Sequence, residues 1–122
     1  MKFMMIVKSA ENAGPPPKSL MDAIGELGIE ATRNGKMVEM GGLHPTVAGA
    51  RVRLAGGRIA VIDGPFTEAK ELVGGFAIVK ASSKKEAIEI GSRFMMLHKE
   101  ALGGKWEGEC EIRQLSEYGP AE

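Results

Sequence analysis

Apolar and polar residues are distributed along the chain in a pattern that predicts strands and helices in turn. Residues 3–7 form a continuous apolar run and residues 73–81 contain a second one, which is typical of strands that are covered on both faces. Residues 36–42 predict a shorter strand that runs into a turn, and residues 110–115 alternate as a closing strand does. The pattern therefore predicts a sheet with two central strands.

Two further segments have the spacing of amphipathic helices. The first begins at Ser19, with Asp22 as the second member of a capping box, and Asn34-Gly35 ends it. The second begins at Ser83, and Glu86 completes its capping box. The apolar positions at helical spacing are Leu20, Ile24, Leu27 and Ala31 in the first helix and Ala87, Ile90, Gly91, Phe94 and Leu97 in the second.

Residues 50–55 and 58–62 form the most specific local pattern, because the two residues Gly56-Gly57 join them as a hairpin turn does. This turn sets a register that places apolar pairs on one side and a polar pair on the other, as a half-buried hairpin requires. The opposed pairs are Leu54 with Ile59 and Val52 with Val61 on the apolar side, and Arg53 with Ala60 on the other.

The order of the elements is strand, helix, strand, hairpin, strand, helix, strand, which predicts an α+β protein with one domain over residues 1–122. Two helices of this length cover only one face of an antiparallel sheet. The apolar runs at residues 3–7 and 73–81, however, predict strands that are buried on both faces. We therefore expect a second copy of the chain to pack sheet to sheet on the other face, which gives a homodimer.

Charge and cysteine content narrow the range of partners. Lys and Arg number 16, as do Asp and Glu, so no net positive field attracts nucleic acid or an anionic membrane. Cys110 is the only cysteine, which excludes an internal disulfide and is typical of a reducing compartment. The apolar start of the chain is too short for a signal peptide, and no stretch approaches the roughly 20 apolar residues of a membrane span. We expect a cytoplasmic protein that binds neither nucleic acid nor membrane.

Residues 63–71, which read Asp-Gly-Pro-Phe-Thr-Glu-Ala-Lys-Glu, and the Gly-Gly-Phe of residues 74–76 resemble the signature of DGPF-domain proteins, a YCII-related family. Residues 2–5, 49–53 and 111–113 also fall in the order that this family shows, so the resemblance covers about residues 1–115. It implies a ferredoxin-like βαββαβ fold with an added β-hairpin, assembled as a dimeric α+β barrel. It also implies a small-molecule pocket between the helices or at the dimer interface.

The same resemblance gives two expectations about function. Some YCII relatives resemble small enzymes that use a His-Asp pair, and many DGPF members are encoded beside extracytoplasmic-function sigma factors. The histidine of that pair comes from the first helix in those relatives, whereas residues 18–34 of this chain contain none. The resemblance therefore does not transfer a catalytic pair to this chain.

Asp63 and His44 are the candidate catalytic residues. Alternation places Asp63 on the side of Ile59 and Val61, where partial desolvation suits a carboxyl group to general acid–base chemistry. The alternative is a structural role, because an aspartate before Gly-Pro commonly accepts backbone N–H bonds in a turn. His44 lies in a predicted loop, and histidine exchanges protons near neutral pH.

The remaining polar residues give weaker signals. His98 is expected at the surface or as a cap near the end of the second helix, and Lys70-Glu71 as a solvated surface. Two histidines and one cysteine far apart in sequence form no metal motif, and the glycine pairs match no phosphate-binding loop. The sequence thus predicts no metal and no cofactor.

Two functions remain open at this level. The first is a small-molecule-binding protein with acid–base activity of lyase or isomerase type, in which Asp63 acts with help from His44. The second is a non-catalytic dimeric module that binds a metabolite or a regulatory protein. Because the sequence contains no evident nucleophile motif, it names no substrate.

Overall fold

The computed structural model describes residues 1–10, 16–66 and 72–116, which have an α+β architecture with the predicted order of elements. Lys70, Glu71 and part of the predicted loop at residues 9–17 lie outside the described residues. The elements are β1 (Lys2–Ser9), α1 (Lys18–Arg33), β2 (Met37–Gly42), the 3-10 turn η2 (Thr46–Ala48), β3 (Ala50–Ala55), β4 (Arg58–Asp63), β5 (Leu72–Lys80), α2 (Lys84–Leu102) and β6 (Gly108–Gln114).

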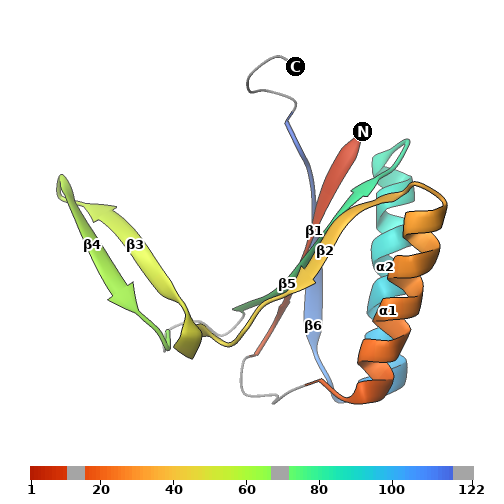
Figure 1. Ribbon diagram of the computed structural model, residues 1–122, viewed down its shortest axis with the longest axis horizontal. Coiled ribbons are helices and arrows are strands. Elements are labelled where there is room, and N and C mark those ends of the chain that lie inside the picture. The colour runs from red at the N-terminus through yellow and green to blue at the C-terminus, as the bar shows by residue number, and fades with distance from the viewer. Residues whose placement is uncertain (11–15, 67–71, 117–122) are drawn as a thin grey trace.

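The main sheet has the strand order β2-β5-β1-β6, and all its pairs are antiparallel. The two strands predicted to be central, β1 and β5, are the inner ones. Both helices cover the same face of the sheet (Figure 1). This arrangement is compatible with the ferredoxin-like fold, in which two helices form one layer on a four-stranded sheet.

The hydrophobic core lies between this sheet and the helices. Phe3, Met5 and Val79 project into it from the two inner strands, and Ala87 packs against them from α2. Helix α2 comes close to the sheet at Gly91, where an added Cβ would lie only 3.0 Å from the Cδ1 of Ile112. Because successive side chains of a strand alternate between faces, the neighbours of these buried residues point to the other side of the sheet.

That other side carries no helix (Figure 1), and we call it the open face. Its centre consists of two cross-strand pairs, Met4 with Ile78 and Ile6 with Phe76, and all four side chains are partly exposed. Beside them the Nζ of Lys8 lies 2.6 Å from the Oε1 of Glu111, and this hydrogen-bonded ion pair lowers the pKa of Glu111. An apolar patch in the middle of a sheet face is thus open to solvent in the single chain.

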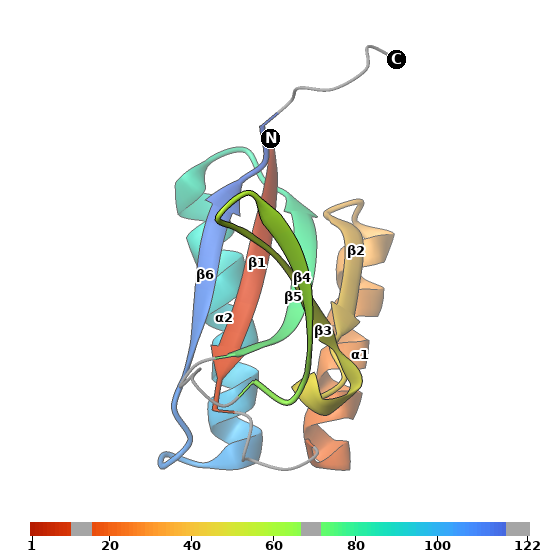
Figure 2. The same ribbon diagram turned by 90° about the vertical axis from the view of Figure 1, so that its left-hand side faces the viewer.

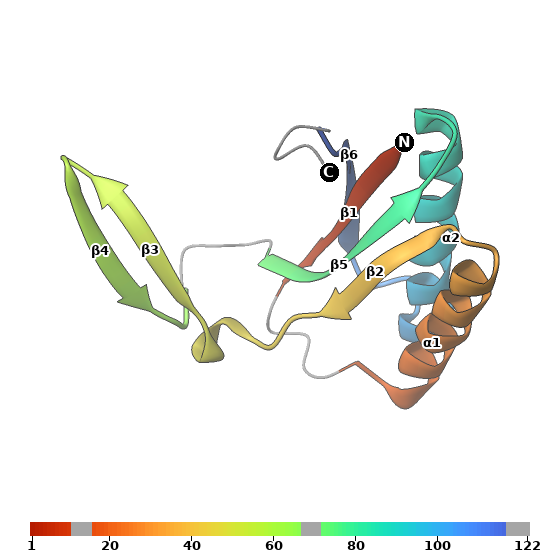
Figure 3. The same ribbon diagram turned by 45° about the horizontal axis from the view of Figure 1, so that its top comes forward.

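Strands β3 and β4 form a separate two-stranded sheet, which we call the arm (residues 50–63). The arm projects away from the main sheet on the side of the open face, as Figures 1, 2 and 3 agree. Its register is the one that the glycine turn predicts, with positive φ angles of 58° at Gly56 and 74° at Gly57.

The arm is not half-buried in the single chain, contrary to the sequence-based expectation. Val52, Leu54 and Ile59 are each 72% exposed and Val61 is 67% exposed. The reason is that the arm pairs with no strand of the main sheet, so nothing within the described chain lies on its apolar side. An isolated two-stranded hairpin is at best marginally stable in water, and this side therefore needs a cover.

The start of α1 differs from the prediction. Ser19 does not cap the helix; the helix begins at Lys18, and Pro17 is the N-cap without a side-chain cap bond. Pro17 has an extended backbone, and its carbonyl accepts the N–H groups of Leu20 and Met21 at 3.1 and 3.2 Å. The rigid proline therefore starts the helix two residues earlier than a cap at Ser19 would.

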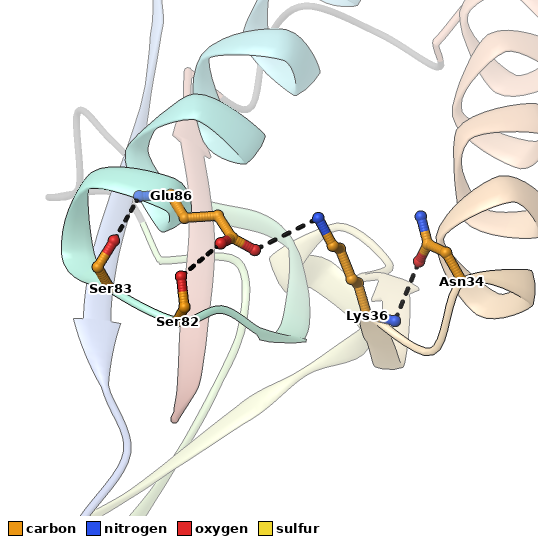
Figure 4. Close-up of polar contacts among 5 residues, drawn as sticks. All are labelled: Asn34, Lys36, Ser82, Ser83 and Glu86. Atoms are coloured by element: carbon orange, nitrogen blue, oxygen red, sulfur yellow. Dashed lines mark hydrogen bonds and ion pairs between the residues drawn. The ribbon is translucent and has the colours of Figure 1, made fainter.

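The start of α2 confirms the Ser83 cap but not a complete capping box. The Oγ of Ser83 accepts the backbone N–H of Glu86 at 3.1 Å (Figure 4). The carboxylate of Glu86 accepts the hydroxyl of Ser82 at 2.6 Å and lies 3.3 Å from the Nζ of Lys36. These contacts, first the Ser82 hydrogen bond and then Lys36, hold the pKa of Glu86 below its usual range. They tie the start of α2 to the residue that precedes β2.

We predict that Glu86→Gln lowers the melting temperature at pH 7. Because the pKa of Glu86 is depressed in the folded protein, its stabilising effect is present above the pKa of the unfolded state. The loss of this stabilisation begins as the pH falls below the unfolded-state pKa of roughly 4.3, and it continues as the pH falls through the lower folded-state pKa. Thermal melts followed by circular dichroism from pH 7 to pH 3 should show the wild-type and variant curves converging.

The matched control for this experiment is Glu89→Gln, an exposed glutamate of the same helix. Its effect should be smaller and should not vary with pH in the same way. A Glu86→Gln effect that stayed constant down to pH 3 would contradict the electrostatic explanation.

Candidate functional site

Asp63 is the last residue of β4 and pairs with Ala50 across the arm. It is exposed, so the expected partial desolvation by the apolar face does not occur in the single chain. Among the described residues, its carboxylate also has no hydrogen-bond or ion-pair partner, and the proposed structural role through backbone N–H bonds is not seen either. The carboxylate is therefore free to accept a proton or to bind a ligand.

The residues that follow Asp63 hold the base of the arm in place. The N–H of Gly64 donates to the carbonyl of Gly49 at 2.9 Å. A Cβ at Gly64 would collide with the backbone carbonyl of Thr46, so only glycine fits this close approach. The N–H of Phe66 then donates to the Oγ1 of Thr46 at 3.2 Å. The glycine of the DGPF motif thus joins the end of β4 to the η2 turn.

The aromatic residue of the motif has a structural contact as well. The guanidinium carbon of Arg51 lies 3.9 Å from the ring centroid of Phe66, which is a cation–π geometry. Because Arg51 belongs to β3, this contact joins the first strand of the arm to the residues that follow the second. The motif from Gly64 to Phe66 therefore fixes the backbone, and Asp63 alone presents a free functional group.

His44 lies in the loop between β2 and η2, and it is exposed as predicted. His44 precedes the arm and Asp63 ends it, so both belong to the region where the arm meets the body. No hydrogen bond or ion pair joins the two side chains within the part of the chain that the structure describes. The described residues therefore do not assemble a catalytic pair from these two side chains.

Two depressions of the described structure lie away from Asp63 and His44. Two open depressions of about 560 and 420 Å³ lie along α1. The first is lined by α1 and the residue after it, and the second lies between α1 and β2, with Ile29 and Arg33 shared by both. Neither includes Asp63 or His44 in its lining. These two depressions therefore do not contain the candidate residues.

The described residues contain no group of three or more His, Cys, Asp or Glu side chains placed to hold a metal ion. Cys110 is partly buried, and this burial raises the pKa of its thiol. A raised pKa lowers the fraction of reactive thiolate. Neither α1 nor α2, the helices of the described residues, combines the length and apolar character needed to cross a bilayer.

His98 is the residue that sequence reasoning placed wrongly. It is 7% exposed rather than at the surface, and its Nδ1 lies 3.0 Å from the carbonyl oxygen of Phe94. Its ring stacks on Trp106 with a centroid distance of 5.0 Å and meets Phe94 edge-on at 4.9 Å. An Nδ1–H donated to that carbonyl satisfies the buried ring. The available signal was the helical spacing of His98 from Ala87 and Phe94 on the buried face.

A family model described as the YCII-related domain matches residues 1–101 of the chain. The chain belongs to the YCII-related family. An uncharacterized protein of Rhizobium meliloti (strain 1021) is 33% identical to it over 88 residues, which are 72% of this chain. The same alignment spans 66% of the relative, slightly less than two thirds of its length. The recognition made from the DGPF signature is thereby confirmed.

In this YCII-related protein, we predict that Gly64→Ala loosens the base of the arm. The added Cβ must displace the backbone of Thr46. This displacement weakens the hydrogen bonds that the N–H groups of Gly64 and Phe66 donate to Gly49 and Thr46. Overpacking of this kind costs roughly 1–3 kcal/mol. Hydrogen exchange of the Phe66 amide, measured by NMR, should therefore be about 5 to 150 times faster than in the wild type.

Gly25→Ala is the control, because a Cβ at this position in α1 meets nothing within 4 Å. An alanine in a helix interior is favoured over glycine, so this variant should gain roughly 0.5–1 kcal/mol and leave the Phe66 amide unchanged. Equal exchange rates in the wild type and Gly64→Ala would contradict the steric explanation.

We also predict that His98 has a packing role in this protein. His98→Ala removes the ring between Phe94 and Trp106 and should cost about 2–4 kcal/mol of unfolding free energy. His98→Phe keeps a ring there and loses only the Nδ1 hydrogen bond, a loss of about 1 kcal/mol. Urea unfolding followed by the fluorescence of Trp106, the only tryptophan, measures both. Equal losses in the two variants would instead indicate that the imidazole nitrogen is essential.

Proposed function

We propose that the protein is a homodimeric small-molecule-binding protein in which Asp63 acts as a general acid–base group, in a reaction of lyase or isomerase type. One observation carries the proposal: the carboxylate of Asp63 is exposed and has no partner among the described residues, while the backbone beside it is fixed at Gly64. A fixed backbone with a free functional group is the arrangement that catalysis and ligand binding need.

The chemistry follows from the groups at the base of the arm. An ionised carboxylate takes up a proton from an acidic carbon or a hydroxyl group of the ligand, and a nearby histidine returns one near neutral pH. His44 is the histidine that supplies this second group in the proposal. Neither proton transfer requires a metal ion or a cofactor. The proposed location of the protein is the cytoplasm, as expected for a chain with one cysteine.

A homodimer completes the site in this proposal. The open face of the sheet and the apolar side of the arm are both uncovered in the single chain. Full burial of a side chain such as Val52 or Leu54 contributes roughly 1.5–3 kcal/mol. A second copy that covers these surfaces, in the manner of a dimeric α+β barrel, encloses the base of the arm and excludes water from Asp63.

The second candidate is a non-catalytic dimeric module that binds a metabolite or a regulatory protein. The observation in its favour is that neither of the two depressions along α1 includes Asp63, while a large apolar surface is exposed on the arm. A link to an extracytoplasmic-function sigma factor belongs to this candidate. Binding without turnover is the property that separates it from the first.

We predict that a thermal-shift screen of small carboxylates, phenols and lactones finds a ligand that depends on Asp63. At about 100 times its dissociation constant, a ligand adds roughly 2.7 kcal/mol, which raises the melting temperature by several degrees in a domain of this size. The wild type should show this shift and Asp63→Asn should lose it. Asp22→Asn, an exposed aspartate on α1, is the matched control and should keep it.

Turnover is tested with the same ligand. Incubation of the ligand in deuterated water with the wild type should lead to deuterium incorporation or product formation, seen by NMR, and Asp63→Asn should abolish it. Binding without either would favour the non-catalytic module. If no compound binds and Asp63→Asn alone lowers the melting temperature sharply, Asp63 is a structural residue and the acid–base proposal fails.

A further inference from the structure

The arm has two chemically different sides. The apolar side consists of Val52, Leu54, Ile59 and Val61, all of which are at least 67% exposed. The opposite side carries Arg51, Arg53 and Arg58, as the alternation in the register of β3 and β4 requires. In a two-stranded sheet of this kind, burial of the apolar side stabilises the sheet, whereas the arginine side is well solvated by water.

The arm and the open face are both on the side of the molecule away from the helices (Figures 1 and 3). The arm makes no extensive contact with any strand or helix of the body, so it does not cover the open face of its own chain. The apolar side of the arm and the open face are therefore both available to a second copy.

Charge favours the same partner. Three arginines and Asp63 give the arm a net charge of +2, and because the whole chain has a net charge of 0, the rest of the chain carries −2. Because the arginines lie on the side away from the contact, these opposite net charges favour the approach of the arm of one copy to the body of another at low ionic strength and form no direct pairs in the contact. In a two-fold symmetric pair this attraction acts twice, once for each arm.

We propose that the arm of each chain reaches across the two-fold axis and packs its apolar side on the second copy. This inference rests on the homodimer of the proposed function and adds the surface that holds it together. The base of the arm carries Asp63, so an arm held by the partner also holds Asp63 at the interface between the copies. The site is incomplete without the second chain.

Sedimentation equilibrium of two double variants tests the proposal. Leu54→Ser/Ile59→Ser removes one cross-strand pair from the apolar side, and Arg53→Ser/Ala60→Ser changes the adjacent pair on the opposite side. The first should weaken the dimer by about 100-fold or more, since four buried apolar side chains are lost per dimer. The second should change the dissociation constant by less than about threefold. Neither pair belongs to the core, so both variants keep their helical circular dichroism.

Photo-cross-linking identifies what the arm touches. The photoreactive residue p-benzoylphenylalanine in place of Leu54 should give a covalent dimer after irradiation of the full chain, whereas the same residue in place of Arg53 should give far less. A product cross-linked only within one chain would show that the arm folds back on its own sheet, which overturns the proposal.

The outcomes separate the two proposals. A wild type that stays monomeric up to high micromolar concentration refutes the homodimer and the arm contact together. A wild-type dimer that the Leu54→Ser/Ile59→Ser variant leaves unchanged, with no cross-link from position 54, refutes the arm contact alone. A weakened dimer and an inter-chain cross-link support the arm contact.

Discussion

A single layer of two helices covers one face of a four-stranded sheet, and this constraint governs the rest of the structure. Phe3, Met5 and Val79 are buried beneath the helices, whereas Met4 and Ile78, their neighbours on the same strands, remain partly exposed. A strand with apolar residues on both faces is stable only if both faces are covered. Both helices lie on one face of the sheet, and the remaining strands, β3 and β4, project away from the sheet. Its apolar residues are therefore divided between a buried core and surfaces that are exposed in the single chain.

The base of the arm is where this division meets the candidate chemistry. Gly64 packs against the η2 turn, Phe66 hydrogen-bonds to Thr46, and Arg51 lies over the Phe66 ring. These contacts fix the backbone around Asp63 without using its carboxylate. By contrast, His98 is buried, contacts Phe94 and Trp106, and belongs to the packing of α2. The two residues differ in their surroundings: the carboxylate of Asp63 is exposed, whereas the ring of His98 is enclosed by its neighbours.

Sequence reasoning was most accurate where the cause is local. The glycine turn of the hairpin, the Ser83 cap and the end of α1 at Asn34-Gly35 each depend on residues that adjoin in the chain, and all are confirmed. The central position of β1 and β5 followed from their apolar runs. The failures have other causes. Ser19 does not cap α1 because Pro17, two residues earlier, already begins the helix, and His98 is buried because its ring stacks on Trp106, which follows the helix. The exposure of the arm was not foreseen either, because alternation shows that one side is apolar but not what covers it.

The close approach at Gly64 separates the shape of the turn from the chemistry of the residue before it. The glycine meets a steric requirement of the turn against Thr46. The side chain at position 63 is exposed and takes no part in that close approach. A substitution there can therefore change the chemical group at the end of β4 without changing the path of the backbone.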